Sequence, residues 1–342
     1  MTVAASEGTG FGKVMTGEPS VFAGKSISAS GRGMGVWNAL YYLFKPFLPQ
    51  AVRHTMRRLR ANHVLRTCRE WPVMESAGQA PAGWPGWPDG KKFAVVLTHD
   101  VEGPVGYERC LRLAEIEAEL GFRSSFNLIP EGGYRVTRSF RDALAMAGFE
   151  VGVHDLRHDG SLYRSARSFD EAVPAINRYL AEWGAAGFRS GFMFHNLDWI
   201  GKLDIDYDAS TFDTDPFEPQ PDGAGTIFPF FVPNDRPNGG YVELPYTLPQ
   251  DITMYVILRE TSNRIWKQKT RWIASRGGMV LINTHPDYMA MDGARPALGE
   301  FDADLYFGYL RDLRERYSGE FWNPLPRELA RRVREWHGKN DG

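Results

Sequence analysis

The feature that most constrains the fold is a regular alternation of short apolar runs and helix-like segments that begins at Phe93. The unbroken apolar run of residues 93–97 is typical of a strand buried on both faces, as in parallel sheets. The runs SSFNLIP, FEVGVH and MVLINTH repeat this pattern. We therefore expect an α/β fold, namely a distorted or incomplete (β/α) barrel of seven strands with an N-terminal helical extension. An open doubly wound sheet fits less well, because polar residues gather at successive strand ends.

Composition divides the chain into four segments. Residues 1–35 are rich in Gly and Ser and poor in large apolar groups, so we expect a flexible N-terminal tail. Residues 36–70 have the pattern of a basic amphipathic helical segment. The prolines and glycines of residues 71–92 indicate a linker, whose tryptophans anchor it to the next domain. Residues 93–338 carry the βα units and are expected to form the main domain.

The basic segment has two interpretations. It begins with large apolar residues and continues with six arginines, which are Arg53, Arg57, Arg58, Arg60, Arg66 and Arg69. One interpretation is a helix that packs on the barrel and leaves its arginines in solvent. The other is a helix that lies on an anionic membrane surface or binds a protein of polysaccharide assembly.

Charge and cysteine content exclude several classes of protein. The formal net charge of -2 provides no overall field that would attract nucleic acid. Two cysteines, Cys68 and Cys110, do not indicate a disulfide framework. The sequence has no leader pattern and no apolar stretch that could span a membrane, so we expect a cytoplasmic protein, with peripheral membrane contact through residues 36–70 as an option.

Two carboxylates follow each other at the end of the first apolar run, in the sequence THDVEG. Asp100 and Glu102 are two residues apart, so on an extended chain both side chains point the same way. Two close carboxylates are unfavourable unless a cation lies between them or one of them keeps its proton. The pair therefore indicates a metal site or acid–base chemistry, and the alternative is a turn cap or a surface pair.

Two histidines end a later apolar run, in the sequence HDLRH. On one helical turn, the four-residue spacing of His154 and His158 would place both imidazoles on the same face. Two histidines and a carboxylate are a common ligand set for catalytic zinc, so Glu102 could complete the site. The alternative is a chance spacing, with one histidine in solvent.

Two further strand ends carry polar residues. His285 closes LINTH, and Arg189 lies in FRSG. Active sites of (β/α) barrels collect side chains from the carboxyl ends of several strands. Arg189 could hold Asp100 ionised there, whereas a single strand-end histidine is more often structural.

Taken together, these motifs resemble the polysaccharide deacetylases of carbohydrate esterase family 4, in the subgroup whose first motif reads DVD or DVE. The matching pieces are THDVEG, HDLRH, FRSG, YDAS and LINTH, and they occur in the family's order. The first motif departs from the commoner form, in which two aspartates are adjacent, because Val101 separates the two acids here. The resemblance implies these roles: Asp100 as catalytic base, His285 as catalytic acid, Glu102, His154 and His158 as metal ligands, Arg189 to orient the base, and Asp208 to tune His285.

The resemblance implies a metal-dependent carbohydrate N-deacetylase, with residues 93–338 as its catalytic domain. The expected cofactor is a divalent metal, Zn²⁺ above all, with Co²⁺, Ni²⁺ or Mn²⁺ as alternatives. The expected substrate is an N-acetylated amino sugar, glycan or polysaccharide precursor. Two alternatives remain open. A haloacid-dehalogenase-type phosphatase would use DVEG but leaves the histidines without a role. A deacetylase-like barrel with altered motifs could bind a glycan or an assembly partner without turnover.

Overall fold

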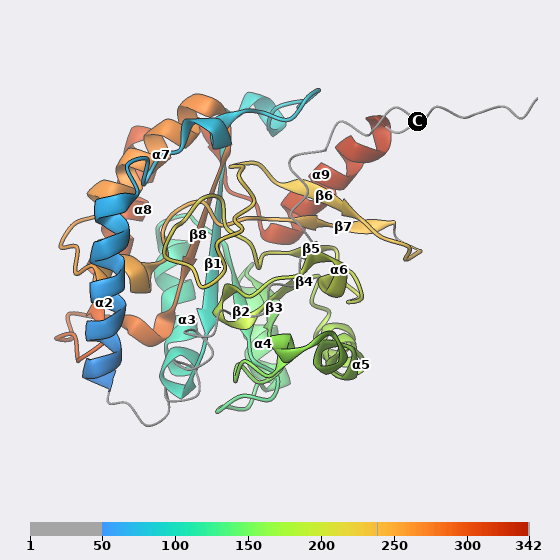
Figure 1. Cartoon of the computed structure of the whole chain (residues 1–342), viewed down its shortest axis with the longest axis horizontal. Helices are drawn as coiled ribbons and strands as arrows, with labels where there is room; N and C mark the ends of the chain where they lie inside the picture. The colour runs from blue at the N-terminus through green and yellow to red at the C-terminus, as the bar shows by residue number, and fades with distance from the viewer. Residues whose placement is uncertain (1–49, 238, 341–342) are drawn as a thin grey trace, which may run out of the picture.

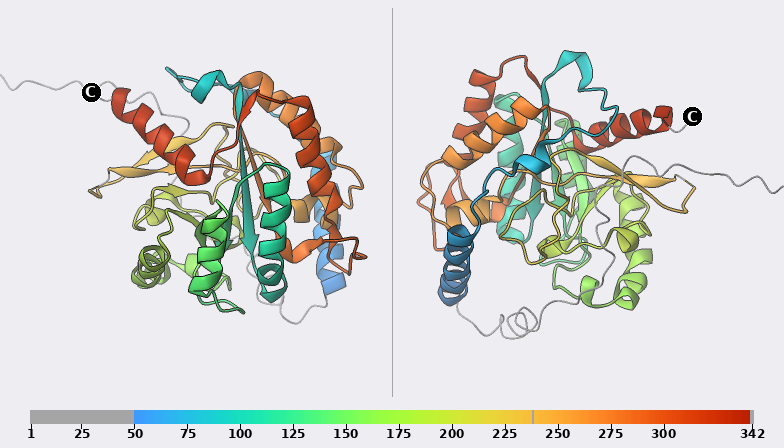
Figure 2. Two further views of the ribbon diagram at one scale, coloured as in Figure 1. Left: turned by 180° about the vertical axis from the view of Figure 1, so that it is seen from behind. Right: turned by 45° about the horizontal axis from the view of Figure 1, so that its top comes forward.

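The computed structural model of the chain describes residues 50–237 and 239–340 (Figure 1). The predicted tail of residues 1–35 lies outside the described residues, as does the beginning of the predicted basic segment. The described chain is a curled sheet with helices packed on its outer side (Figure 2).

Seven strands pair in parallel in the order β8-β1-β2-β3-β4-β5-β7. They are β1 (Phe93–Val101), β2 (Ser124–Leu128), β3 (Glu150–His154), β4 (Gly187–Arg189), β5 (Tyr207–Asp208), β7 (Gly240–Glu243) and β8 (Met279–Thr284). The chain after β7 returns to β8, where the N–H groups of Thr247 and Leu248 donate to the carbonyl of Leu281 at 3.0 and 3.2 Å. These bonds bring the two ends of the sheet together, which confirms the predicted distorted barrel.

Short strands extend this sheet or lie beside it. β11 (Phe321–Trp322) pairs in parallel with the beginning of β1, and β6 (Phe230–Pro233) pairs antiparallel with β7. A separate two-stranded sheet joins β9 (Met289–Ala290) to β10 (Phe301–Asp302). None of them interrupts the order of the seven parallel strands.

Helices connect the strands and cover the outer face. They are α3 (Pro104–Glu119), α4 (Arg138–Met146), α5 (Ala166–Trp183), α6 (Leu197–Ile200), α7 (Arg264–Arg276), α8 (Asp304–Arg316) and α9 (Pro326–Asn340). Short turns are η2 (Glu75–Gly78), η3 (Pro88–Gly90), η4 (Leu162–Arg164), η5 (Gly191–Met193) and η7 (Pro286–Tyr288), and η6 (Ile252–Ile257) is a π-helix. Within the described ranges, no helix combines the length and apolar character needed to cross a bilayer.

The period of two along β1 determines which side chains reach the barrel interior. All nine residues of β1 are buried. Phe93, Val95 and Leu97 pack in the hydrophobic cluster that includes residues of α3, α7 and α8. Ala94 and Val96 pack in a different cluster, with residues of β5, β7 and β8. Because alternate residues of a strand point to opposite faces, Asp100 continues the inward row that begins with Ala94.

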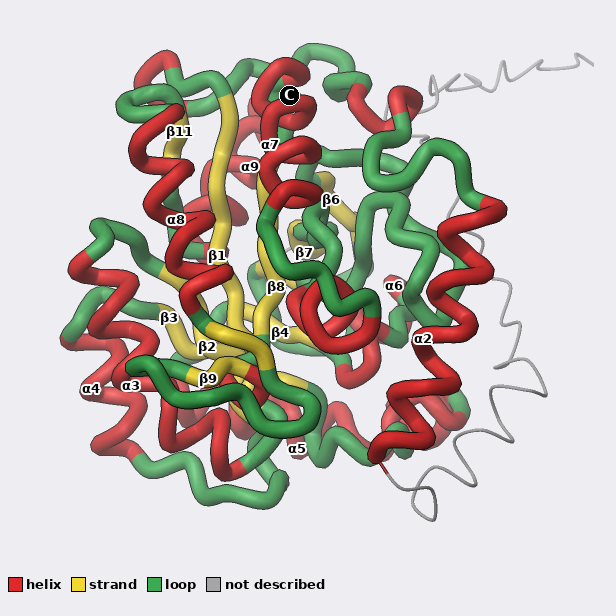
Figure 3. The backbone as a smooth tube through the Cα atoms, turned by 90° about the vertical axis from the view of Figure 1, so that its left-hand side faces the viewer, coloured by secondary structure: helices red, strands yellow, loops and turns green. Residues whose placement is uncertain are grey.

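The chain before β1 packs on this barrel. Helix α2 (Gln50–Thr67) lies alongside the loops that follow β5 and β7 (Figure 3). In the segment expected to be a linker, Trp87 is buried, and its Nε1 donates to the carbonyl of Gly277 at 2.8 Å. Trp84 packs edge-on against Trp87 and Trp336. The tryptophans of this segment therefore anchor it to the barrel.

Candidate active site

Five of the seven predicted site residues line one cavity of about 400 Å³, reached from the carboxyl ends of the parallel strands. Asp100 lies near the end of β1 and Glu102 just after it. His154 ends β3, and His285 follows β8. Since the carboxyl ends of parallel strands meet at one edge, side chains far apart in sequence converge here. His158, in the loop after β3, is the fifth.

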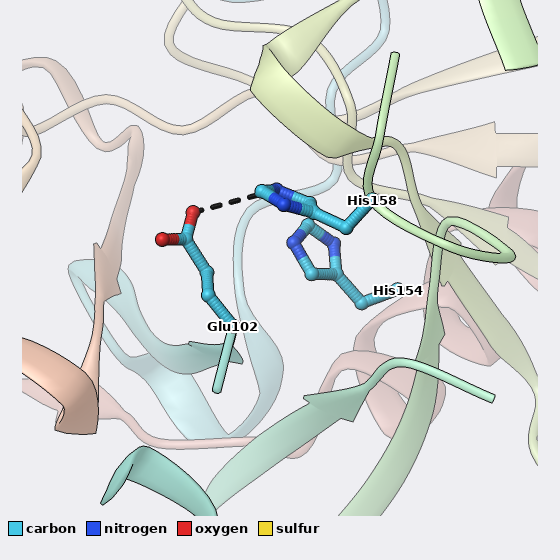
Figure 4. Close-up of side chains that lie close together, drawn as sticks. All are labelled: Glu102, His154 and His158. Atoms are coloured by element: carbon cyan, nitrogen blue, oxygen red, sulfur yellow. Dashed lines mark ion pairs between the residues drawn. The ribbon is translucent and has the colours of Figure 1, made fainter. Parts of the chain in front are cut away.

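Three of these residues form a cluster that could hold a cation. One ligand atom from each of Glu102, His154 and His158 lies within 4.8 Å of the other two. Figure 4 shows the carboxylate of Glu102 facing the ring of His158, with the ring of His154 beside them. Nε2 of His158 lies 3.4 Å from Oε1 of Glu102. Neither histidine Nε2 has a hydrogen-bond partner among the described residues.

The tautomer of His154 follows from its other ring nitrogen. Nδ1 lies 3.1 Å from the backbone carbonyl of Arg189. A carbonyl only accepts, so Nδ1 carries the proton and Nε2 presents its lone pair to the cluster. Buried polar atoms normally have partners, and a histidine held in this way is typical of metal ligands. The three residues therefore fit a divalent cation.

His158 reaches the cluster by a different route from the one that the sequence predicts. The expected helical turn is wrong, because residues 155–161 form a loop with bends rather than a helix. Asp155 and His158 both have positive φ angles, 56° and 55°. The ring of His158 then stacks on Phe192, with centroids 4.4 Å apart. A Cβ at Gly191 would lie 2.9 Å from this ring, so a side chain at that position would displace it.

Glu102 is held by the turn that follows β8. Its backbone N–H donates to Oδ2 of Asp287 at 2.9 Å. The hydroxyl of Tyr288 donates to its carboxylate. Burial raises the pKa of Glu102, but His158 and His285 outweigh burial and bring the pKa down to about 2. Glu102 is thus an ionised carboxylate in a fixed position, although Val101 separates it from Asp100.

Asp100 is a buried carboxylate with partners on both oxygens. Asn127 of β2 donates to Oδ1 at 2.9 Å, and Asn283 of β8 donates to Oδ2 at 2.7 Å. Nε of Arg189 lies 3.5 Å from Oδ1, as expected from the sequence. Burial raises the pKa of Asp100, but the charges of Arg189, His154 and His285 outweigh it and hold the pKa well below its usual range. The side chain is therefore ionised.

His285 has an acidic partner, but the predicted partner is wrong. Asp251, and not Asp208, contacts His285: Oδ1 lies 2.6 Å from Nδ1, and Oδ2 accepts from the backbone N–H at 2.7 Å. Asp208 instead accepts from Ser210 and lies in a separate buried cluster with Glu243. Burial alone would lower the pKa of His285, but the carboxylate of Asp251 outweighs burial and raises the pKa to about 10. The imidazole therefore carries a proton at neutral pH.

Sequence reasoning missed several residues of this site. They are Arg57, Arg60, Asn127, Asp251, Asn283 and Tyr288. A signal for Asn127 and Asn283 was present, since each is an amide in an otherwise apolar strand that pairs with β1. Such a residue lacks water inside a barrel and needs a polar partner, which Asp100 provides.

No protein-family model matches this sequence, and no curated protein matches it by sequence. Solved structures do match. A candidate polysaccharide deacetylase from Mycobacterium smegmatis superposes with a TM-score of 0.57 at 18% identity, covering 76% of this chain and 96% of that one. This likeness confirms the fold: the chain has the fold of a polysaccharide deacetylase.

Two other matches superpose less closely. One is a candidate polysaccharide deacetylase involved in O-antigen biosynthesis from Bordetella bronchiseptica, with a TM-score of 0.39 at 16% identity, covering 72% of this chain and 86% of that one. The other is the peptidoglycan deacetylase PdaC from Bacillus subtilis, with a TM-score of 0.39 at 15% identity, covering 75% and 96%.

Proposed function

We propose that this protein is a divalent-metal-dependent hydrolase that removes the acetyl group from an N-acetylated amino sugar in a glycan or a polysaccharide precursor. The observation that supports it best is a pair of groups with opposite displaced pKa values in one cavity. The pKa of Asp100 is lowered, and that of His285 is raised to about 10, beside a cluster of three ligand residues. Environments that push two pKa values apart identify an acid and a base.

Glu102, His154 and His158 would hold the cation. Two imidazoles and one carboxylate suit Zn²⁺, and Co²⁺, Ni²⁺ or Mn²⁺ accept the same donors. When bound, such a cation lowers the pKa of water and polarises a carbonyl oxygen. The turn after β8 fixes Glu102, and the carbonyl of Arg189 fixes the ring of His154, so the ligands are oriented in advance.

In this proposal, Asp100 and His285 transfer the protons. Asp100, kept ionised by Arg189, accepts a proton from the attacking water. The water oxygen bonds to the acetyl carbon, and the carbon–nitrogen bond breaks. His285, kept protonated by Asp251, donates its proton to the departing amine nitrogen. The products are acetate and a free amino sugar.

Acetate release from a panel of N-acetylated sugars tests this proposal. We expect turnover by the metal-loaded wild type and a loss of at least about 100-fold in Asp100→Asn and His285→Ala, because general acid–base catalysis contributes about 10²–10⁴. Both variants should still bind metal, since neither residue is in the ligand cluster. Full turnover in either variant would refute the assigned roles. Metal binding without acetate release from any substrate would favour the non-catalytic glycan-binding alternative.

A further inference from the structure

Two arginines of α2 line the same cavity as the ligand cluster. Arg57 and Arg60 belong to a helix that precedes the barrel in sequence, yet both border the cavity that also holds Asp100 and His285. The loop after β5 contributes Glu218 to the lining. The cavity therefore has cationic side chains that the proposed hydrolysis does not use.

The contacts of α2 explain why these arginines reach the cavity. Between them, Arg58 donates through Nε to the carbonyl of Ile257 at 2.9 Å, which holds the helix against η6. Arg60 donates to the backbone carbonyl of Glu218 at 3.3 Å. Ala61 is buried in the main hydrophobic cluster. Ala61 and Arg58 thus hold α2 on the protein, and the exposed side chains of Arg57 and Arg60 border the cavity.

Within residues 50–237 and 239–340, neither Arg57 nor Arg60 forms an ion pair. Glu218, which lines the cavity beside these arginines, accepts hydrogen bonds from Tyr246 and Gln250. Burial raises the pKa of Glu218, and these bonds and the charge of Arg57 offset this effect only in part. Two positive charges therefore border the cavity without an ion-pair partner among the residues described.

We propose that Arg57 and Arg60 form a subsite for an oxyanion carried by the substrate, so that the substrate is an acidic N-acetylated sugar. The oxyanion is a phosphate or a carboxylate, because a guanidinium binds either group through paired hydrogen bonds. This inference rests on the proposed deacetylation for the identity of the sugar. Recognition of the oxyanion itself is a binding event that needs no turnover.

Equilibrium binding to the zinc-loaded Asp100→Asn protein separates the subsite from catalysis. The ligands are N-acetylglucosamine, its 1-phosphate and an N-acetylated hexosaminuronate. We expect at least one acidic ligand to bind about tenfold or more tightly than the neutral sugar, and Arg57→Gln/Arg60→Gln to remove that difference. The matched control is Arg66→Gln, an exposed position on the same helix that does not line the cavity. The two acidic ligands distinguish a phosphate-bearing from a carboxylate-bearing substrate.

Two outcomes would overturn the inference. Equal binding of neutral and acidic sugars would show that the arginines select no oxyanion. An acidic preference that survives in the Arg57/Arg60 double variant but disappears in His158→Phe would show that the anion binds the cation alone. With the active enzyme, the double variant should raise KM for the acidic sugar and leave kcat nearly unchanged, since neither arginine contacts the proton-transfer groups. Failure of acetate release alone would count against the proposed reaction and not against the subsite.

Discussion

Removal of one ligand nitrogen should abolish stabilisation of the fold by metal. His158→Phe is the most informative change, because it removes Nε2 and keeps an aromatic ring on Phe192, 4.4 Å away. That Nε2 has no hydrogen-bond partner among the residues described, so its loss breaks no existing hydrogen bond. Without metal, the variant should therefore unfold close to the wild-type temperature.

The size of the metal effect follows from mass action. A ligand that binds only the folded state stabilises it by RT ln(1 + [L]/Kd), or about 2.7 kcal/mol at a concentration of 100 Kd. For a domain of this size, 1 kcal/mol corresponds to roughly 2 °C in Tm, so we expect a rise of about 5 °C. In His158→Phe two ligands remain, Glu102 and His154, and the shift at the same metal concentration should be near zero.

Differential scanning calorimetry measures this difference. The protein is freed of metal with a chelator and then titrated separately with Zn²⁺, Co²⁺, Ni²⁺ and Mn²⁺. His63→Ala, an exposed histidine on α2, is the matched control and should keep the full shift. An equal metal-dependent rise in wild type and His158→Phe would refute the ligand assignment. Loss of the rise in His63→Ala would place the metal at a different site.

Two further predictions concern buried charges outside the cluster. Lys269→Met should cost about 3–5 kcal/mol in urea unfolding, because it removes the ion-pair partner of the buried carboxylate of Asp213, whose Oδ2 lies 2.6 Å from the amine. Lys267→Met, in a partly exposed pair on the same helix, should cost under about 1 kcal/mol, and similar losses in both would contradict the argument. Burial and the charge of Glu218 raise the pKa of Asp215 to about 7. Protonated Asp215 therefore contributes its full share to the free energy of unfolding below about pH 4. This contribution is lost as the pH rises through 7, by up to about 1.4 kcal/mol per pH unit. Asp215→Asn should remove this dependence, and parallel curves of unfolding free energy against pH would refute it.

Strand ends were the part of the site that the sequence could predict. The inward row of β1 follows from a period of two, and the meeting of strand ends follows from parallel pairing. Asp100, His154 and His285 needed nothing beyond these two rules, because each lies at or next to the end of a strand. Arg189 ends β4 and came within reach of Asp100 for the same reason.

Residues in loops could not be placed by the same rules. His158 was predicted on a helical turn, but two positive φ angles in residues 155–158 bring its ring to the cluster. The four-residue spacing of His154 and His158 is the same in a helical turn and in this loop, so spacing alone could not distinguish the two conformations. Asp251 was missed because it lies at the beginning of a π-helix, in a stretch with no strand pattern. Its contact with His285 depends on how the chain returns from β7 to β8.

The orientation of α2 shows where a usually reliable rule fails. Val52, Met56 and Leu59 form one stripe at 100° per residue, and the rule of apolar burial would turn this stripe toward the barrel and the arginines toward solvent. In the structure the apolar stripe faces solvent, with Leu59 67% exposed, while Arg57 and Arg60 border the cavity and are exposed as well. Sequence periodicity carries information only about burial, and here contacts of the arginine side chains orient the helix. An exposed apolar stripe departs from the local rule of apolar burial, and such departures are expected where function and packing compete. For this reason we place the binding of a negatively charged substrate group at this helix.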